Sequence, residues 1–169
     1  MLSWQQEAEL HSKQCYPEEA CGLVYIFKGK TKYKACKNIS INPKNTFIID
    51  PLEYAEIFDK ASIIGVFHSH PIDQPYPTPA DKAICEKYKY KWHIYSVDFN
   101  KWYSFEPSGY KAPLVGREYV FGIHDCWSLI RDYFETLNIK VRDWDRPINP
   151  QDFCDNPYFE NCFEKTGFR

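Results

Sequence analysis

The chain has 169 residues, enough for one domain with a hydrophobic core or for one compact domain followed by part of a second. Its formal net charge is only -2 and 26% of its residues are charged, so the attraction that drives binding to nucleic acids or anionic membranes has no source, and no nucleic-acid partner is expected. The longest apolar run near the centre covers residues 61–67, and the N-terminus lacks the basic-then-apolar order of a signal peptide. We therefore expect a soluble cytoplasmic protein without a membrane span.

The first half of the chain predicts a mixture of helices and strands. Ser3 can cap a first helix, and Pro51 stands where a helix favours its first proline. Lys28, Gly29 and Lys30 suit a tight turn between two β-rich segments, which predicts a hairpin. In chain order we expect a helix over residues 3–14, a hairpin of strands 21–27 and 31–36, a short strand 46–49, a helix 51–61 and a buried strand 63–68.

A proline-rich loop separates this half from the next elements. Residues 71–79 contain four prolines, and each removes an amide donor and restricts the residue before it. A third helix is expected from near Thr78 to about Tyr88, followed by strands over residues 91–98 and 101–105. Together these elements predict an α+β layer arrangement.

The character of the sequence changes after the last of these strands. Residues 108–113 combine Ser, Gly and Pro without apolar periodicity and are the best candidate for a linker. Beyond them, Asp125 can cap an amphipathic helix over residues 126–137. We therefore expect one domain over residues 1–107 and a second, partial segment over residues 114–169.

Two histidines and a carboxylate form the clearest candidate for a functional site. His68 and His70 stand at i and i+2, so on a strand both imidazoles lie on one face and can converge on one ion. Asp81 lies in the first turn of the next helix, where the loop can bring it back toward the histidines. Two neutral nitrogens and one carboxylate, with a fourth position for water, are typical of a catalytic zinc site. We expect one zinc ion per chain, with Glu19 as the acceptor of the water's proton.

Each of these fragments also has a structural interpretation that the sequence leaves open. An H-x-H pair by itself is often two packed or surface histidines. Residues 78–81 make a good helix start, with Thr78 as the cap and Asp81 near the positive end of the helix dipole. Glu18 and Glu19 are consistent with a solvated acidic pair. The joint occurrence of all three fragments in this order favours the metal site.

The order of these motifs resembles the JAMM (JAB1/MPN/Mov34) metalloproteases, which share an upstream glutamate and an H-x-H-P signature followed by S/T-x-x-D. The matching segments are Pro17-Glu18-Glu19-Ala20-Cys21-Gly22-Leu23, His68-Ser69-His70-Pro71 and Thr78-Pro79-Ala80-Asp81, and the likeness covers about the first 105 residues. The resemblance implies a JAMM/MPN-like, cytidine deaminase-like fold, in which helices flank a mixed sheet.

Carried over residue by residue, the resemblance implies that His68, His70 and Asp81 bind zinc. It also implies that Glu19 is the general base and later the proton donor, since the family's glutamate stands two residues before the Cys-Gly pair. The hydroxyl of Thr78 would stabilise the oxyanion. Family members more often have serine at this position, so threonine can change the rate or the access to the site.

A second resemblance begins near the end of the chain. Residues 122–133 place Cys126 at a helix start, where the dipole lowers the pKa of a thiol; a buried structural cysteine is the alternative. The segment is similar to the start of the NlpC/P60 cysteine peptidases, which implies an incomplete NlpC/P60-like α+β segment with Cys126 as nucleophile. Such a peptidase needs a downstream histidine to accept the thiol proton, and the last histidine of this sequence is His124. We therefore expect that Cys126 does not hydrolyse peptides in this chain.

The two resemblances in this order imply a phage or prophage protein of the tail assembly class. They imply a zinc-dependent peptidase or isopeptidase that acts on a protein or peptide, with cell-wall peptide as one candidate substrate and phage tail proteins as partners. The expected locations are the host bacterial cytoplasm during assembly and the virion tail tip. The alternative is a non-catalytic tail assembly factor that keeps the metalloprotease fold and works by binding.

Overall fold

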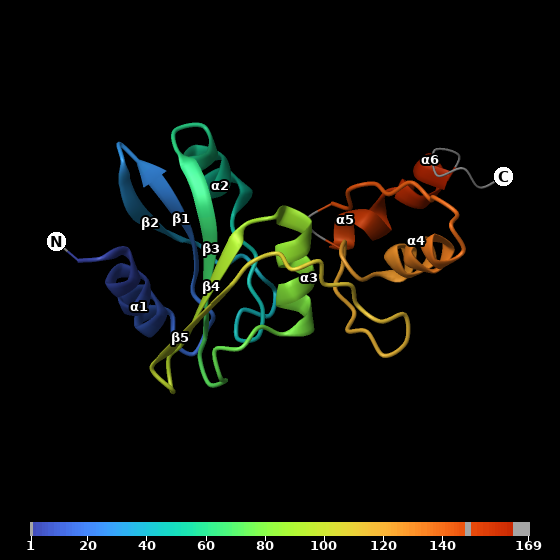
Figure 1. Cartoon of the computed structure of the whole chain (residues 1–169). Coiled ribbons are helices and arrows are strands. Elements are labelled where there is room, and N and C mark those ends of the chain that lie inside the picture. The colour runs from blue at the N-terminus through green and yellow to red at the C-terminus, as the bar shows by residue number, and fades with distance from the viewer. Residues whose placement is uncertain (1, 148–149, 164–169) are drawn as a thin grey trace. The chain divides into compact units, whose positions relative to one another are not determined.

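A five-stranded mixed sheet forms the centre of the first part of the chain (Figure 1). The computed structural model describes residues 2–147 and 150–163. The chain divides into two compact units, Met1–Pro77 with Tyr88–Ser108 and Thr78–Lys87 with Gly109–Arg169. All the strands of the sheet belong to the first unit.

The strands of the first unit run in the order β2-β1-β3-β4-β5. In chain order its elements are α1 (Trp4–Cys15), β1 (Cys21–Phe27), β2 (Lys30–Cys36), α2 (Pro51–Phe58), β3 (Ser62–His70), β4 (Lys91–Ser96) and β5 (Lys101–Phe105). Neighbouring strands are antiparallel except for the parallel pair β3 and β4. Helix α1 packs against β1, β2 and β3, and α2 contacts β3. A mixed sheet flanked by helices confirms the predicted α+β fold.

Helix α1 covers one face of the sheet and closes the core of the first unit. It begins at a capping box, in which the Gln6 N–H donates to Ser3 Oγ and the Ser3 N–H donates to Gln6 Oε1 (3.2 and 2.8 Å). Trp102 Nε1 on β5 donates to Glu9 Oε1 at 2.8 Å and ties the helix to the sheet. The buried apolar side chains of this core are Ala8, Ala20, Val24, Phe67 and Tyr95.

The register of the central strands determines which side chains lie beside the histidines. Cys21, the first residue of β1, pairs with His68 on β3, and His68 pairs with Ile94 on β4. Glu19 lies two residues before Cys21, and His70 lies two residues after His68. The antiparallel pairing therefore brings the backbone of Glu19 to the end of β3 that carries His70.

The hairpin and the helix starts confirm the predictions, whereas several boundaries differ by a few residues. Lys28 and Gly29 in the β1–β2 turn have φ of 49° and 73°, the left-handed conformation that a tight hairpin turn requires. Helix α2 begins at Pro51 as predicted but ends at Phe58, three residues before the expected end. Strand β3 is longer than expected and includes both histidines, and β4 ends at Ser96.

The strand predicted over residues 46–49 is wrong. This segment is a loop with a single bridge between Asn38 and Ile49. The Asn38 side chain takes the place of a partner strand: its Nδ2 donates to Thr46 O (3.1 Å), and its Oδ1 accepts from the Ile48 N–H (3.1 Å). Because one amide side chain satisfies these backbone groups, the segment needs no ladder.

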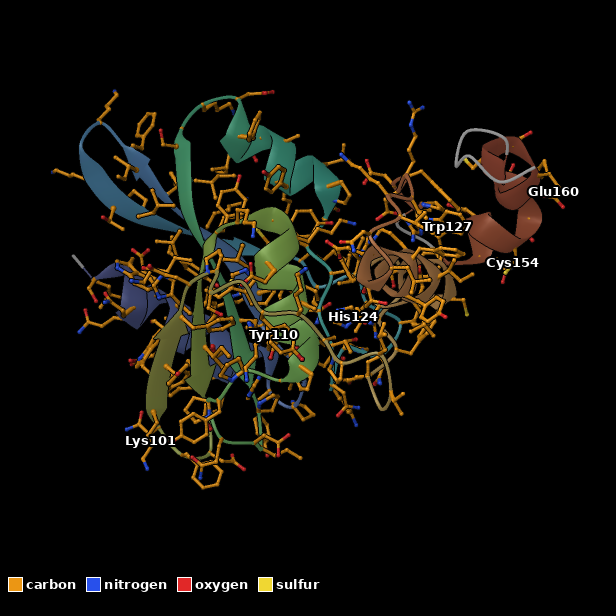
Figure 2. All side chains as sticks on the ribbon, turned by 45° about the vertical axis from the view of Figure 1, so that its right-hand side comes forward. Lys101, Tyr110, His124, Trp127, Cys154 and Glu160 are labelled. Carbon is orange, nitrogen blue, oxygen red and sulfur yellow. The ribbon has the colours of Figure 1, made fainter. Side chains whose placement is uncertain are left out.

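The second unit is helical, with α3 (Pro79–Tyr88), α4 (Cys126–Thr136), α5 (Pro150–Asp155) and α6 (Tyr158–Phe163). Asp125 caps α4 as predicted, since its side chain accepts from the Ser128 N–H at 2.8 Å. Trp127, labelled in Figure 2, packs against Trp144 with the ring centroids 4.4 Å apart. The two short helices α5 and α6 were not expected from the sequence.

The division into residues 1–107, a linker over 108–113 and a segment over 114–169 stays a prediction. Residues 148–149 and 164–169 of that last segment lie outside the described residues. Among the residues that the structure describes, no helix has the length and apolar character to cross a membrane.

Candidate metal centre

The two histidines of the H-x-H motif meet at the end of β3. His68 and His70 are 1% and 6% exposed, and they lie on the same face because side chains alternate along a strand. Their Nε2 atoms are 3.1 Å apart. Two nitrogens that each lie 2.0–2.1 Å from one tetrahedral zinc ion are about 3.3 Å apart. The ring nitrogens therefore have the separation that a shared metal ion requires.

The backbone selects the tautomer of His70. Its Nδ1 lies 2.8 Å from the carbonyl oxygen of Gln74, and a carbonyl can only accept a hydrogen bond. Nδ1 therefore carries the proton, and in the neutral ring Nε2 presents its lone pair toward His68. A hydrogen bond from the second ring nitrogen to a carbonyl is the usual support of a metal-ligating histidine.

Aromatic rings hold the imidazole of His68. Phe47 stacks on it with centroids 4.7 Å apart and an interplanar angle of 22°, and Trp92 meets it edge-on at 5.4 Å. Phe47 comes from the loop after β2, and Trp92 from β4. The packing fixes the plane of the ring, so the orientation of Nε2 does not depend on a bound ion.

Asp81 occupies the first turn of α3, and Thr78 caps that helix. Asp81 Oδ2 accepts from the Thr78 N–H (2.8 Å) and from Thr78 Oγ1 (2.9 Å), and Thr78 Oγ1 accepts from the Asp81 N–H (3.1 Å). This reciprocal arrangement confirms the helix-start interpretation of the motif. The hydroxyl of Thr78 has one proton, which it donates to Asp81. To stabilise an oxyanion as expected, the Thr78 hydroxyl would have to donate its proton to the oxyanion in place of Asp81.

The helix start does not exclude ligation. One side-chain ligand atom from each of His68, His70 and Asp81 can be chosen so that all three lie within 4.8 Å of one another. All three residues are buried, and polar side chains are rarely buried unless they are hydrogen-bonded, paired with a charge or bound to a metal ion. Two imidazole nitrogens and one carboxylate oxygen are a donor set that suits zinc, so this group could bind a metal ion.

Glu19 is buried with 7% exposure, whereas its neighbour Glu18 is exposed. The Glu19 N–H donates to Pro43 O (2.7 Å), and its carbonyl accepts from Asn38 Nδ2 (3.0 Å). A solvated acidic pair therefore describes Glu18 but does not describe Glu19. The assignment of Glu19 as general base stays a prediction, supported by this burial and by the register that brings its backbone to the end of β3.

Cys126 is the first residue of α4 and is exposed. The preceding Asp125 forms an ion pair with Arg146, with Oδ2 and Nε 2.9 Å apart. Burial lowers the pKa of His124, so this ring is neutral near pH 7. The nucleophile role of Cys126 stays a prediction, and so does the expectation that it does not hydrolyse peptides in this chain.

Three contributors to the site were not identified from the sequence, the Gln74 carbonyl, Phe47 and Trp92. The Gln74 carbonyl, which orients His70, carries no sequence signal because every residue has a carbonyl group. Phe47 lies in the segment 46–49, for which the sequence predicts a strand, and only the folded chain brings it to His68.

Comparison with known proteins decides the family. Residues 2–106 match the model of the prokaryotic homologs of the JAB domain. The chain belongs to this family. The match spans the segments that carry Glu19, the histidine pair and Asp81, so it confirms the resemblance to JAMM proteins on which the expected fold rests.

Relatives of this JAB-domain chain include phage proteins. It is 33% identical over 162 residues to the tail tip assembly protein K of Escherichia phage N15, covering 94% of this chain and 66% of that protein. It is 24% identical over 119 residues to the tail tip assembly protein K of Escherichia phage lambda, covering 70% of this chain and 57% of that protein. The chain thus spans about two thirds or less of the length of these relatives.

A solved structure supports the fold independently. The solution structure of a protein from Desulfitobacterium hafniense matches with a TM-score of 0.50 and 24% identity, over 61% of this chain and 79% of that one. At this level of identity the likeness shows the fold alone.

Proposed function

We propose that this chain is a zinc-dependent peptidase or isopeptidase of the JAMM type, of phage or prophage origin. The observation that carries the proposal is the convergence of His68 and His70, with Nε2 atoms 3.1 Å apart, on a group that includes Asp81. We further propose one zinc ion per chain, held by these three residues. Glu19 is buried, and its backbone lies beside the end of β3. A structural metal site would need no such proton acceptor, so Glu19 favours a catalytic site.

The proposed reaction is the hydrolysis of an amide bond. A zinc ion in this site would lower the pKa of a water molecule to about 7 and polarise the substrate carbonyl. Glu19 accepts the proton of the attacking water and returns it to the leaving nitrogen, so that the amine departs neutral. The hydroxyl of Thr78 stabilises the oxyanion once its bond to Asp81 has switched.

We propose tail tip assembly or the processing of cell-wall peptide as the setting of this reaction. The names of the N15 and lambda relatives support the first, with phage tail proteins as partners. The host cytoplasm during assembly and the virion tail tip are then the places where the protein acts. The substrate on this proposal is a protein or peptide, not a nucleic acid.

The decisive experiment compares Glu19→Gln with Glu18→Gln in the whole chain. Zinc per chain is measured by mass spectrometry of the metal, and hydrolysis with a panel of quenched fluorescent peptides that contain α-peptide, isopeptide or cell-wall stem-peptide bonds. We expect Glu19→Gln to keep its zinc and to lose about 10²–10⁴-fold in rate. Glu18→Gln removes a similar charge at an exposed neighbour and should change neither quantity.

The relatives' names also favour a second candidate, a non-catalytic assembly factor that keeps the metalloprotease fold. This candidate predicts that binding to phage tail proteins survives Glu19→Gln unchanged and that no peptide in the panel is cleaved. Hydrolysis by the wild-type chain that disappears in Glu19→Gln would reject it. Equal hydrolysis by both proteins would reject the assignment of Glu19.

A further inference from the structure

We propose that Ser96 is a positioning residue for His70. Its hydroxyl fixes the loop of residues 71–77 so that the Gln74 carbonyl accepts from His70 Nδ1, and this bond leaves Nε2 as the nitrogen that can bind a metal ion. The inference deepens the proposed metal site and rests on it. Every contact that carries it lies within the first unit.

The start of the loop is hydrogen-bonded to the turn that follows β4. The Val97 N–H donates to His70 O at 3.0 Å, and the Asp98 N–H donates to Pro71 O at 3.2 Å. These bonds attach the end of β3 and the first residue of the loop to the turn that follows β4. They fix where the loop starts but do not reach Gln74.

Ser96 makes the next contact and is 0% exposed. Its Oγ donates to Asp73 O at 2.6 Å and accepts from the Phe99 N–H at 3.3 Å. The hydroxyl therefore joins the loop to the turn after β4. Asp73 is the residue immediately before Gln74, so this bond holds the peptide group next to the carbonyl that His70 uses.

A second anchor lies on the other side of Gln74. Pro75 is buried, and the ring of Tyr76 meets Tyr103 on β5 edge to face, with centroids 5.4 Å apart and an interplanar angle of 76°. Gln74 is thus held between Ser96 on one side and Tyr103 on the other. An exposed loop residue acquires a fixed carbonyl direction because both of its flanks are attached to strands.

The consequence for metal binding follows from the chemistry of imidazole. A neutral ring carries its proton on Nδ1 or on Nε2, and the protonated nitrogen cannot be a ligand. The Gln74 carbonyl stabilises the Nδ1–H form, which is the form with Nε2 available. When the loop is released, both forms are populated and the ring also loses a partner that orients it, so the apparent affinity for the ion falls for both reasons.

The test uses the whole chain and two readouts. In the metal-free protein, the ¹⁵N chemical shifts of the His70 ring report its tautomer at a fixed neutral pH. In the second measurement, a chromogenic chelator competes for zinc and gives the dissociation constant. Ser96→Ala should convert His70 to a mixture of tautomers and weaken zinc binding about 10-fold, the lower end of the effect of removing an outer-shell partner.

Three further variants separate positioning from general damage. Ser96→Thr keeps a hydroxyl and should restore both readouts. Ser104→Ala is the matched control: it removes a strand hydroxyl that lies 2.8 Å from Nδ1 of His93, a histidine outside the metal group, and should change neither readout at His70. If Ser96→Ala does not fold, Tyr76→Leu weakens the exposed second anchor and should shift the tautomer in the same direction, with a measurable loss of zinc affinity.

A single Nδ1–H tautomer of His70 in folded Ser96→Ala, with the zinc dissociation constant unchanged, would overturn the inference. So would an unchanged tautomer in Tyr76→Leu if that is the variant used. A wild-type chain that binds no zinc would instead count against the proposed function, because the tautomer of His70 is measured without metal.

Discussion

Ala20 and Ser69 exchange two hydrogen bonds across the end of the sheet. The Ala20 N–H donates to Ser69 Oγ, and the Ser69 N–H donates to Ala20 O, both at 2.9 Å. Ser69 separates the two histidines and points to the opposite face of β3, whereas Ala20 follows Glu19 directly. The pair therefore fastens the backbone of the expected base to the backbone of the expected ligands. We therefore expect Ser69 to support the geometry of the site through these two hydrogen bonds.

Ser69→Ala should destabilise the first unit by about 1–3 kcal/mol, because it leaves the buried N–H of Ala20 without its acceptor. Urea unfolding followed by tryptophan fluorescence measures the change, since three of the five tryptophans, Trp4, Trp92 and Trp102, lie in the first unit. Ser62→Ala, at the exposed start of the same strand, should stay within about 0.5 kcal/mol of wild type. Equal losses in the two variants would show that the Ala20–Ser69 bond is not the cause.

Zinc should raise the thermal stability of the chain. At a free concentration 100 times its dissociation constant, a ligand that binds only the folded state adds about 2.7 kcal/mol, which for a unit of this size moves Tm upward by about 10 °C or more. A chelator should reverse the shift. His68→Ala and Asp81→Ala should abolish it, because each removes one member of the ligand group.

The control for this measurement is His11→Ala. His11 Nδ1 lies 2.8 Å from the hydroxyl of Tyr33, and this histidine is outside the metal group. The variant can alter Tm itself but should keep the full zinc-induced shift. A shift that His68→Ala and His11→Ala share equally would mean that zinc acts elsewhere.

Acid should destabilise the first unit through His93. Burial, with a smaller effect from Lys91, lowers the pKa of this imidazole to about 4, whereas Glu106 acts weakly in the opposite direction. The unfolded chain titrates near 6.5 and therefore binds the proton first, so stability is lost as the pH falls from about 6.5 to 4. The loss from this group is at most about 3 kcal/mol.

His93→Gln removes the titrating group and should flatten this part of the pH profile. Urea unfolding of the metal-free chain at several pH values between 4 and 7 measures the difference between the two slopes. Parallel profiles for wild type and His93→Gln would assign the acid sensitivity to other groups. A loss of stability in His93→Gln that is the same at every pH would come from lost packing between Trp4 and His93, whose ring centroids are 4.9 Å apart.

The second unit offers a test of the Asp125–Arg146 pair. The two side chains are 9% and 3% exposed, so removing one charge leaves the other buried and unpaired. Arg146→Gln should lower the opening free energy of α4 by about 3 kcal/mol, seen as roughly 100-fold faster amide hydrogen exchange in that helix. Arg131→Gln is the matched control, since its side chain is 33% exposed and its pairs with Asp132 and Asp143 are more solvated. Equal acceleration by both variants would contradict the special role of the buried pair.

Local chemistry explains why much of the fold could be predicted. The caps Ser3 and Asp125 act within three residues of themselves, and the Lys28-Gly29 turn needs only its own backbone conformation. The alternation of a strand alone puts His68 and His70 on one face. The motifs also indicated the family, and the match of residues 2–106 to the family model confirms it.

The wrong strand and the open choice between a solvated and a buried acidic pair have one physical cause, which is contact with residues outside the local segment. The apolar segment 46–49 suited a strand by itself, but the amide of Asn38 satisfies its backbone and leaves it as a loop. Glu18 and Glu19 are equivalent in composition, and only the folded chain buries the second and exposes the first.

The sequence by itself determined the helix caps, the hairpin, the shared face of the two histidines and the family, because these depend on residue type and on short spacing. The tertiary structure alone decided which carbonyl orients His70, which serine ties β1 to β3 and which loop residue stacks on His68. Backbone carbonyls, serine hydroxyls and aromatic rings occur at many positions of the sequence. Only the folded chain determines which of them lie in contact.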